Sequence, residues 1–64
     1  MKGVPIDYFL AGRRFAFRRR DFVPAVGHYV RFNGIDYPVE AVYWIEDEGD
    51  DLRVSVMLSM AAGQ

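Results

Sequence analysis

Apolar and polar residues alternate along most of this chain, which is the pattern of half-buried β-strands. In the first segment, for example, Ile6, Tyr8 and Leu10 fall on one face of an extended chain. No window of ten residues shows a helical period. We therefore predict five strands joined by short turns, over residues 6–11, 13–20, 27–32, 35–46 and 52–60.

Two local signals shape the middle of the chain. The dipeptide Asn33-Gly34 predicts a two-residue hairpin, because a type I′ turn needs positive φ at both central positions. In the long strand that follows, Tyr37 and Val39 start on one face, but Val42 and Trp44 are equally apolar. This conflict of registers predicts a β-bulge near residues 40–42 that bends the strand.

Five strands in 64 residues cannot form two broad sheets, but they can curl into a small barrel that leaves few exposed edges. The predicted fold is all-β: one small domain over residues 1–64, with residues 61–64 frayed. It is a five-stranded, strongly bent antiparallel barrel of SH3-like type, with an OB-like topology as the alternative. Every strand contributes to the predicted core, which comprises Tyr8, Leu10, Phe15, Phe17, Val30, Phe32, Val39, Trp44, Val54, Val56 and Leu58.

A pattern of turn glycines and apolar residues covers about the C-terminal two-thirds of the chain. It consists of Pro24, Gly27, Val30, Gly34, Tyr37, Val39, Val42, Trp44, Val54, Val56 and Leu58. In these positions the chain resembles small SH3-like proteins encoded by phages and prophages. The resemblance implies the barrel fold and a mobile-element origin, and it implies no catalytic or binding residue.

The composition is that of a folded domain, with 52% hydrophobic and 16% aromatic residues. The absence of cysteine excludes a disulfide framework and a thiolate zinc site. No apolar run approaches the roughly 20 residues that span a bilayer, and the first residues lack the apolar region of a signal peptide. We therefore expect an intracellular chain, and the resemblance to phage and prophage proteins implies the host cytosol or a virion.

Charge is distributed unevenly along the sequence. Residues 1–32 carry seven basic and two acidic residues, a balance of +5, whereas residues 33–64 carry one basic and seven acidic residues, a balance of −6. Much of the positive charge lies in the stretch "RRFAFRRRDF" (residues 13–22). Arginine is the residue best suited to bidentate contacts with phosphate or carboxylate groups. The candidate binding residues are Arg13, Arg14, Arg18, Arg19, Arg20, Tyr29 and Arg31.

Strict alternation predicts that Phe15 and Phe17 share one face of their strand while Arg14, Ala16 and Arg18 take the other. Three interpretations of the arginines stay open. The first is that they bind nucleic acid beside aromatic rings that stack on bases. The second is that they pair with acidic strands of the same molecule, or simply keep the barrel soluble. The third is that they pack against the acidic face of a second copy. We favour the two phenylalanines as core residues, because a small barrel needs large side chains from each strand.

Other residues that could carry chemistry have no suitable neighbours. His28 lies at the start of a strand with no partner at the spacing of a catalytic triad. The run "EDEGDD" (residues 46–51) lacks the alternate-position spacing of a calcium loop and is typical of a solvated hairpin tip. The sequence predicts no enzyme, no cofactor and no metal site.

These observations support two hypotheses about function. The first is a non-enzymatic protein-binding or assembly module of phage or prophage origin, either a virion component or a small protein that docks on a host complex. Its partner would be another protein or a second copy, with positive edge against negative edge. The alternative is sequence-independent binding of single-stranded nucleic acid, with Arg14, Arg18 and Arg20 contacting phosphates from one strand face. Neither hypothesis involves a membrane or a small-molecule substrate.

Overall fold

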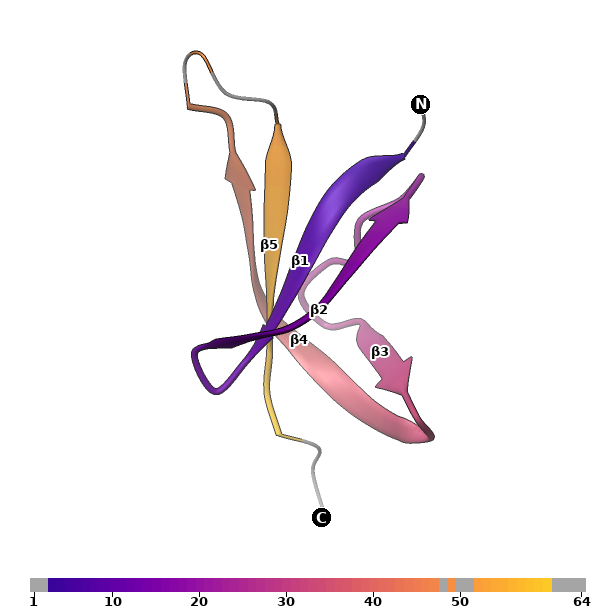
Figure 1. Ribbon diagram of the computed structural model, residues 1–64. Coiled ribbons are helices and arrows are strands. Elements are labelled where there is room, and N and C mark those ends of the chain that lie inside the picture. The colour runs from indigo at the N-terminus through magenta and orange to yellow at the C-terminus, as the bar shows by residue number, and fades with distance from the viewer. Residues whose placement is uncertain (1–2, 48, 50–51, 61–64) are drawn as a thin grey trace.

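The computed structural model describes residues 3–47, 49 and 52–60, and this part of the chain contains five strands and no helix. The strands are β1 (Val4–Leu10), β2 (Arg13–Arg20), β3 (Tyr29–Phe32), β4 (Ile35–Ile45) and β5 (Arg53–Leu58) (Figure 1). Each lies within a few residues of a predicted strand. The predicted frayed end at 61–64 and residues 48, 50 and 51 of the predicted tip lie outside the described residues.

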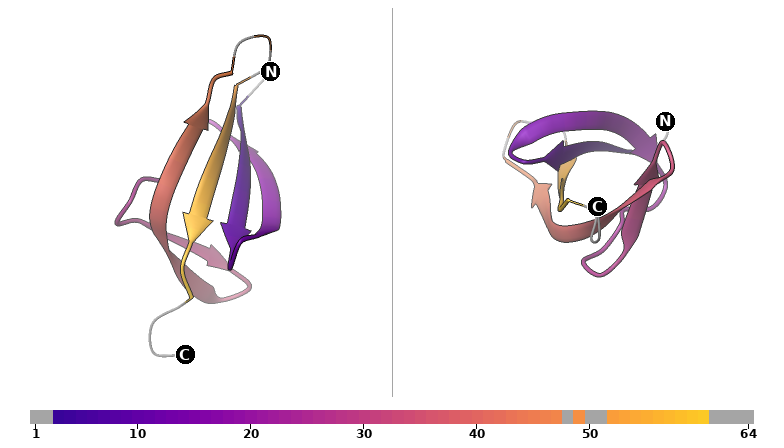
Figure 2. Two further views of the ribbon diagram at one scale, coloured as in Figure 1. Left: turned by 90° about the vertical axis from the view of Figure 1, so that its left-hand side faces the viewer. Right: turned by 90° about the horizontal axis from the view of Figure 1, so that it is seen from below.

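The strands form a single sheet in the order β2-β1-β5-β4-β3, which curls into a half-barrel (Figures 1 and 2). The predicted fold class, a small, strongly bent all-β barrel of five strands, is confirmed. The sheet is mixed rather than wholly antiparallel, because the central strands β1 and β5 run parallel to each other. The antiparallel prediction is wrong for this pair, which joins the two ends of the chain and has no hairpin to fix its direction.

Two of the hairpins, β1–β2 and β3–β4, turn through two residues in the left-handed region. Asn33 and Gly34 have φ values of 52° and 82°, which confirms the predicted turn between β3 and β4. Ala11 and Gly12 connect β1 to β2 with φ values of 54° and 79°. Alanine is unfavourable in this conformation, so the first hairpin closes in spite of its first turn residue.

Two β-bulges change which side chains share a face. The predicted bulge in β4 is confirmed by a register shift between Val39 and Ala41. A second bulge lies in β2, where Tyr8 pairs with Ala16 but Phe9 pairs with Arg14. Phe15 is therefore an extra residue, and it lies on the inner side of the sheet together with Ala16.

The bulge in β2 overturns the predicted pattern of faces in that strand. Arg14 hydrogen-bonds Asp7, and Phe17 pairs with Asp7, so both lie on the outer side. Ala16 packs against the buried core instead of facing solvent with Arg14. We predicted that Phe15 and Phe17 share one face, and that Arg14 shares the other with Ala16 and Arg18. This prediction is wrong, because strict alternation does not continue across a bulge.

The core lies on the concave side of the sheet. Its buried residues are Ile6, Tyr8, Tyr37, Val39, Val54, Val56 and Leu58, and partly buried Leu10, Val30 and Phe32 pack against them. These positions confirm eight of the predicted core residues and add two, Ile6 and Tyr37. Four of these residues are cross-strand neighbours in the central parallel pair, where Ile6 faces Val54 and Tyr8 faces Val56.

An aromatic cluster fills the gap between the edge strands β2 and β3. The ring of Phe15 lies edge-on to Phe32 at 5.0 Å and to Tyr37 at 5.3 Å, and Tyr8 meets Phe32 at 5.4 Å. Edge-to-face contacts at these distances are favourable. Phe15 is thus a core contact, as predicted, although it remains 39% exposed. No backbone ladder joins β2 to β3 in the described part of the chain, so side chains alone close the half-barrel on this side.

Besides Phe15, two other predicted core residues are exposed, and these two make no core contact of that kind. Phe17 is 42% exposed because it lies on the outer side of the sheet. Trp44 is 52% exposed although its pairing with Val54 places it on the inner side. It lies in the second half of β4, beyond the segment that pairs with β3, which ends at Pro38. The strand pattern gave the correct face for Trp44, but the half-barrel does not extend far enough to cover it.

Candidate protein-binding surface

The outer side of the four-stranded part of the sheet carries two consecutive cross-strand rows. From β2 to β4, one row is Phe17, Asp7, Ser55 and Tyr43, and the next is Arg14, Phe9, Met57 and Ala41. Arg53 lies beside the first row, two residues before Ser55. We call these nine residues the outer face. No segment of the described chain forms a second layer over it (Figure 2).

Asp7 is the centre of the outer face and its only described acidic residue. Its carboxylate accepts hydrogen bonds from two arginines of different strands, with Arg14 Nη1 at 2.8 Å from Oδ1 and Arg53 Nη2 at 2.7 Å from Oδ2. The Asp7 side chain is only 6% exposed, whereas those of Arg14 and Arg53 are 58% and 50% exposed. The buried carboxylate therefore holds two guanidinium groups that keep free donors toward solvent.

The ionisation of Asp7 reflects a competition between burial and its partners. Burial raises the pKa of the carboxyl group, but the hydrogen bonds and charges of Arg53 and Arg14 outweigh it, so the pKa lies below its usual value. Asp7 is therefore charged at neutral pH, and the group of three carries a net charge of +1.

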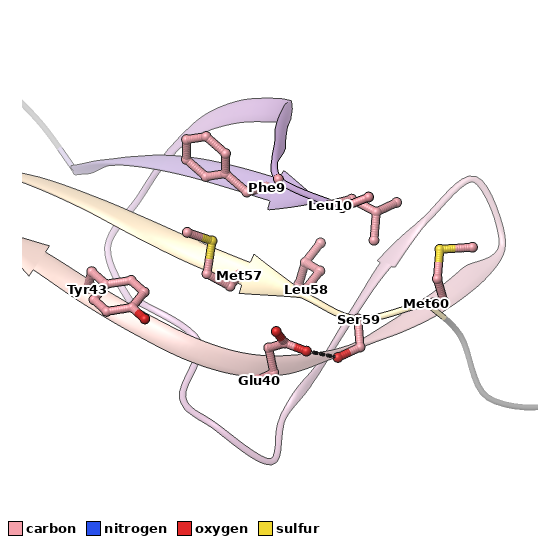
Figure 3. Close-up of a pocket in the computed structure, with 10 residues that line it drawn as sticks. Phe9, Leu10, Glu40, Tyr43, Met57, Leu58, Ser59 and Met60 are labelled. Atoms are coloured by element: carbon pink, nitrogen blue, oxygen red, sulfur yellow. Dashed lines mark hydrogen bonds between the residues drawn. The ribbon is translucent and has the colours of Figure 1, made fainter.

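Apolar side chains flank this charged centre. Phe17 and Tyr43 are 42% and 54% exposed at the two ends of their row, and Phe9 and Met57 are half-buried in the middle of the next row. Phe9, Tyr43 and Met57 line a shallow groove that continues to Met60 (Figure 3). Glu40 also lines the groove and accepts a hydrogen bond from the Ser59 hydroxyl, as Figure 3 shows.

The structure divides the predicted arginine surface into two groups. Arg14 and Arg19 lie on the outer side, since Arg19 pairs with Pro5, two residues before Asp7. Arg13, Arg18 and Arg20 lie on the side of the core residues, where Arg18 pairs with Ile6. The prediction that Arg14, Arg18 and Arg20 form one face is wrong, because the bulge at Phe15 separates Arg14 from the other two.

The remaining predicted residues lie on the far side of the gap between β2 and β3. Tyr29 and Arg31 point away from the core, on the face of β3 opposite to Val30 and Phe32, as predicted. Arg31 makes a bidentate ion pair with Asp36 of the neighbouring strand, so its charge is compensated within the hairpin. A groove brings Arg20, Tyr29 and Arg31 together.

His28 belongs to the turn that precedes β3. Its Nδ1 accepts a hydrogen bond from the Ala25 backbone amide at 3.0 Å, and its own amide donates to the Ala25 carbonyl at 2.9 Å. These contacts give the side chain a role in the turn. In the ranges that the structure describes, no three metal-binding side chains lie close enough to hold an ion.

Sequence reasoning missed the two residues that organise the outer face. Asp7 was counted only as a charge, and Arg53 only as the lone base of the acidic half. A signal for Asp7 was present, because it lies between Ile6 and Tyr8 in an otherwise apolar strand. A carboxylate in such a position requires a cationic partner if it is buried. Nothing in the sequence indicated that one of its two partners, Arg53, is 46 residues away.

Comparisons with known proteins give no relative for this chain: no family model, curated protein or solved structure matches it. Among the residues that the structure describes, no helix is both long and apolar enough to cross a membrane.

Proposed function

We propose that this chain is a non-enzymatic protein-binding or assembly module that docks through its outer face. The observation that carries the proposal is the exposure of Phe17 and Tyr43 beside two arginines fixed by buried Asp7. Aromatic residues, methionine and arginine are the types enriched at protein interfaces, and tyrosine and arginine are frequent among the residues that dominate binding energy.

The cluster of Asp7, Arg14 and Arg53, called the Asp7 cluster below, also supports binding by reducing its entropic cost. A free arginine loses much side-chain freedom when a partner immobilises it, at about 0.5–1.5 kcal/mol for each such side chain. Arg14 and Arg53 are already held by carboxylate contacts of 2.8 and 2.7 Å. Their exposed donors are therefore preorganised for an acidic group of the partner.

Charge complementarity makes a second copy the first partner to consider. The outer face and adjacent Arg19 carry three arginines against one aspartate, while residues 33–64, apart from Arg53 of the outer face, carry seven acidic residues and no basic one. A head-to-tail contact between the outer face of one copy and the acidic half of another would join opposite charges and could repeat in an assembly. The resemblance to small phage and prophage proteins supports, as part of the same proposal, a place in a virion or in the host cytosol.

The experiment is light scattering of the purified chain over a wide range of concentrations, at low and at high salt. We expect association that rises with concentration and weakens in high salt. Tyr43→Ser, on the outer face, should reduce association. Tyr29→Ser removes a tyrosine from another surface that is even more exposed, 68% against 54%, and should leave association unchanged. A strict monomer at every concentration and ionic strength, or equal effects of the two variants, would contradict assembly through the outer face.

A further inference from the structure

The gap between the edge strands β2 and β3 forms a second surface that shares no residue with the outer face. It is a groove lined by Tyr8, Arg20, Phe22, His28, Tyr29 and Arg31, with Arg18 beside it over the ring of Phe32. We call it the seam groove. Its walls come from β2, from β3 and from the loop between them, so one bound molecule could contact both edges of the half-barrel.

Two arginines of the seam groove have no acidic partner in the described part of the chain. Arg18 and Arg20 donate only to backbone carbonyl oxygens, those of Phe17 at 2.7 Å and Arg19 at 2.8 Å. By contrast, Arg31 is paired with Asp36. The guanidinium group of Arg18 also lies 5.5 Å from the centre of the Phe32 ring, within the range of a cation–π interaction.

Arg20 lines the seam groove together with Tyr8, and Arg18 lies beside the groove. Burial raises the pKa of Tyr8, and the charges of Arg20 and Arg18 partly oppose this increase. The groove thus concentrates positive charge at a site where a hydroxyl donor is also present. This combination suits an anion with several oxygen acceptors, such as a phosphate group.

Two exposed aromatic rings accompany these cations. Tyr29 is 68% exposed and Phe22 is 86% exposed, and both line the groove. Large rings left in solvent beside uncompensated arginines are the combination by which proteins bind unpaired bases and the backbone that joins them. A duplex would offer the phosphates but keep its base faces stacked, so the rings favour a single strand.

We propose that the seam groove binds single-stranded nucleic acid without sequence preference. Arg18 and Arg20 contact successive phosphates, and Tyr29 and Phe22 stack on bases. Arg14, on the opposite side of the sheet, takes no part. The inference goes beyond the proposed protein-binding function, because it concerns different residues and a different class of partner.

The test is fluorescence anisotropy of a labelled oligothymidine with the intact chain at low salt, followed by a salt titration. We expect Arg18→Ser/Arg20→Ser to weaken binding at least tenfold and to reduce the slope of log affinity against log salt by about 1.4, or 0.7 for each lost phosphate contact. Arg13→Ser/Arg19→Ser removes the same charge from the same strand outside the groove and should change affinity less than threefold. Tyr29→Ala should weaken binding about tenfold through lost stacking.

Several outcomes would overturn the proposal. The first is that the parent chain does not bind the oligonucleotide at low salt, and the second is that both double arginine variants lose the same affinity. The third is that a duplex binds as tightly as the single strand, and the fourth is that polyglutamate of matched charge competes as well as unlabelled oligothymidine. The last result would identify the groove as a site for acidic protein segments. If the Arg18 change destabilises the fold, Arg20→Ser and Tyr29→Ala decide the question, because both alter exposed side chains that belong to no core contact. Tyr43→Ser should bind the oligonucleotide like the parent.

Discussion

The two faces of strand β1 are buried by different means. On the inner face, Ile6 and Tyr8 are 0% and 4% exposed because the sheet curls around them and brings the strands of both chain ends together. On the outer face, Asp7 is equally buried, at 4%, but its cover consists of arginine side chains that are themselves half exposed. One face is closed by the fold and the other by side chains.

This difference separates stability from binding. The inner face depends on apolar area removed from water, and it cannot open without unfolding the sheet. The outer face depends on hydrogen bonds and on the aliphatic stems of Arg14 and Arg53, which can rearrange around a partner while the strands stay in place. We therefore expect substitutions on the inner face to affect unfolding most and those on the outer face to affect binding most.

The largest effect should come from Ile6→Ala. Ile6 is fully buried beside Val54, so its truncation should cost about 2–5 kcal/mol in unfolding free energy, a large share of what a small domain has. Urea denaturation followed by circular dichroism measures this loss. Phe9→Ala, on the outer face of the same strand, should cost less although it removes a larger side chain. A greater loss for Phe9→Ala would reverse the assignment of the two faces.

Local features of this fold were predictable from the sequence. The Asn33-Gly34 turn and the bulge near Glu40 depend on residues within a few positions of each other, and both are confirmed. The conflict of apolar registers in β4 was visible because both candidate faces carried large residues. The bulge at Phe15 gave no such conflict, since the residues around it alternate regularly. The position of this bulge is set by how β2 pairs with β1, and the local pattern of residues does not determine that pairing.

Features that depend on distant parts of the chain were missed. The parallel pairing of β1 with β5 and the contact between Asp7 and Arg53 join the two ends of the sequence. Alternation within a strand indicates which residues share a face, but it does not indicate which strand lies beside it. For this reason the candidate site was placed on one run of arginines, whereas the structure distributes those arginines over two surfaces.

The next largest effect should come from Asp7→Asn. Asparagine keeps the shape of the side chain, but its amide group presents a donor to one of the two arginines and has no charge. Loss of a carboxylate from a fully buried ion pair typically costs 3–5 kcal/mol, and we expect about 1–3 kcal/mol here because both arginines can turn to solvent. Thermal unfolding measures the change. A variant as stable as the parent would show that the Asp7 cluster does not stabilise the outer face.

A smaller effect should appear in the pH dependence of stability. The pKa of Asp7 is lower in the folded chain than its usual value of about 4 in an unfolded chain. Its contribution is therefore fully present above about pH 4 and is lost as the pH falls through the lower folded value. Urea midpoints measured between neutral and acidic pH should fall for the parent and fall less for Asp7→Asn.

Asp36→Asn is the control for this pH profile. The hydrogen bond and charge of Arg31 also lower the pKa of Asp36, but this ion pair lies on the surface, where water screens it. The variant should therefore follow the parent profile more closely than Asp7→Asn does. A stronger effect of Asp36→Asn would mean that the exposed pair, and not the buried carboxylate, controls stability in acid.

The smallest effect should come from Trp44→Ala, although tryptophan is the largest side chain on the inner side of the sheet. Burial of Trp44 in the core would predict a loss of about 3–5 kcal/mol. Because the side chain is 52% exposed and lies beyond the segment of β4 that pairs with β3, we expect a loss of about 1 kcal/mol in unfolding free energy.

Trp44 is the only tryptophan, so its fluorescence reports the exposure of this side chain directly. Its emission should change little on unfolding and should be quenched by acrylamide in the native state. A blue-shifted, protected emission would show instead that the inner face is closed along its whole length.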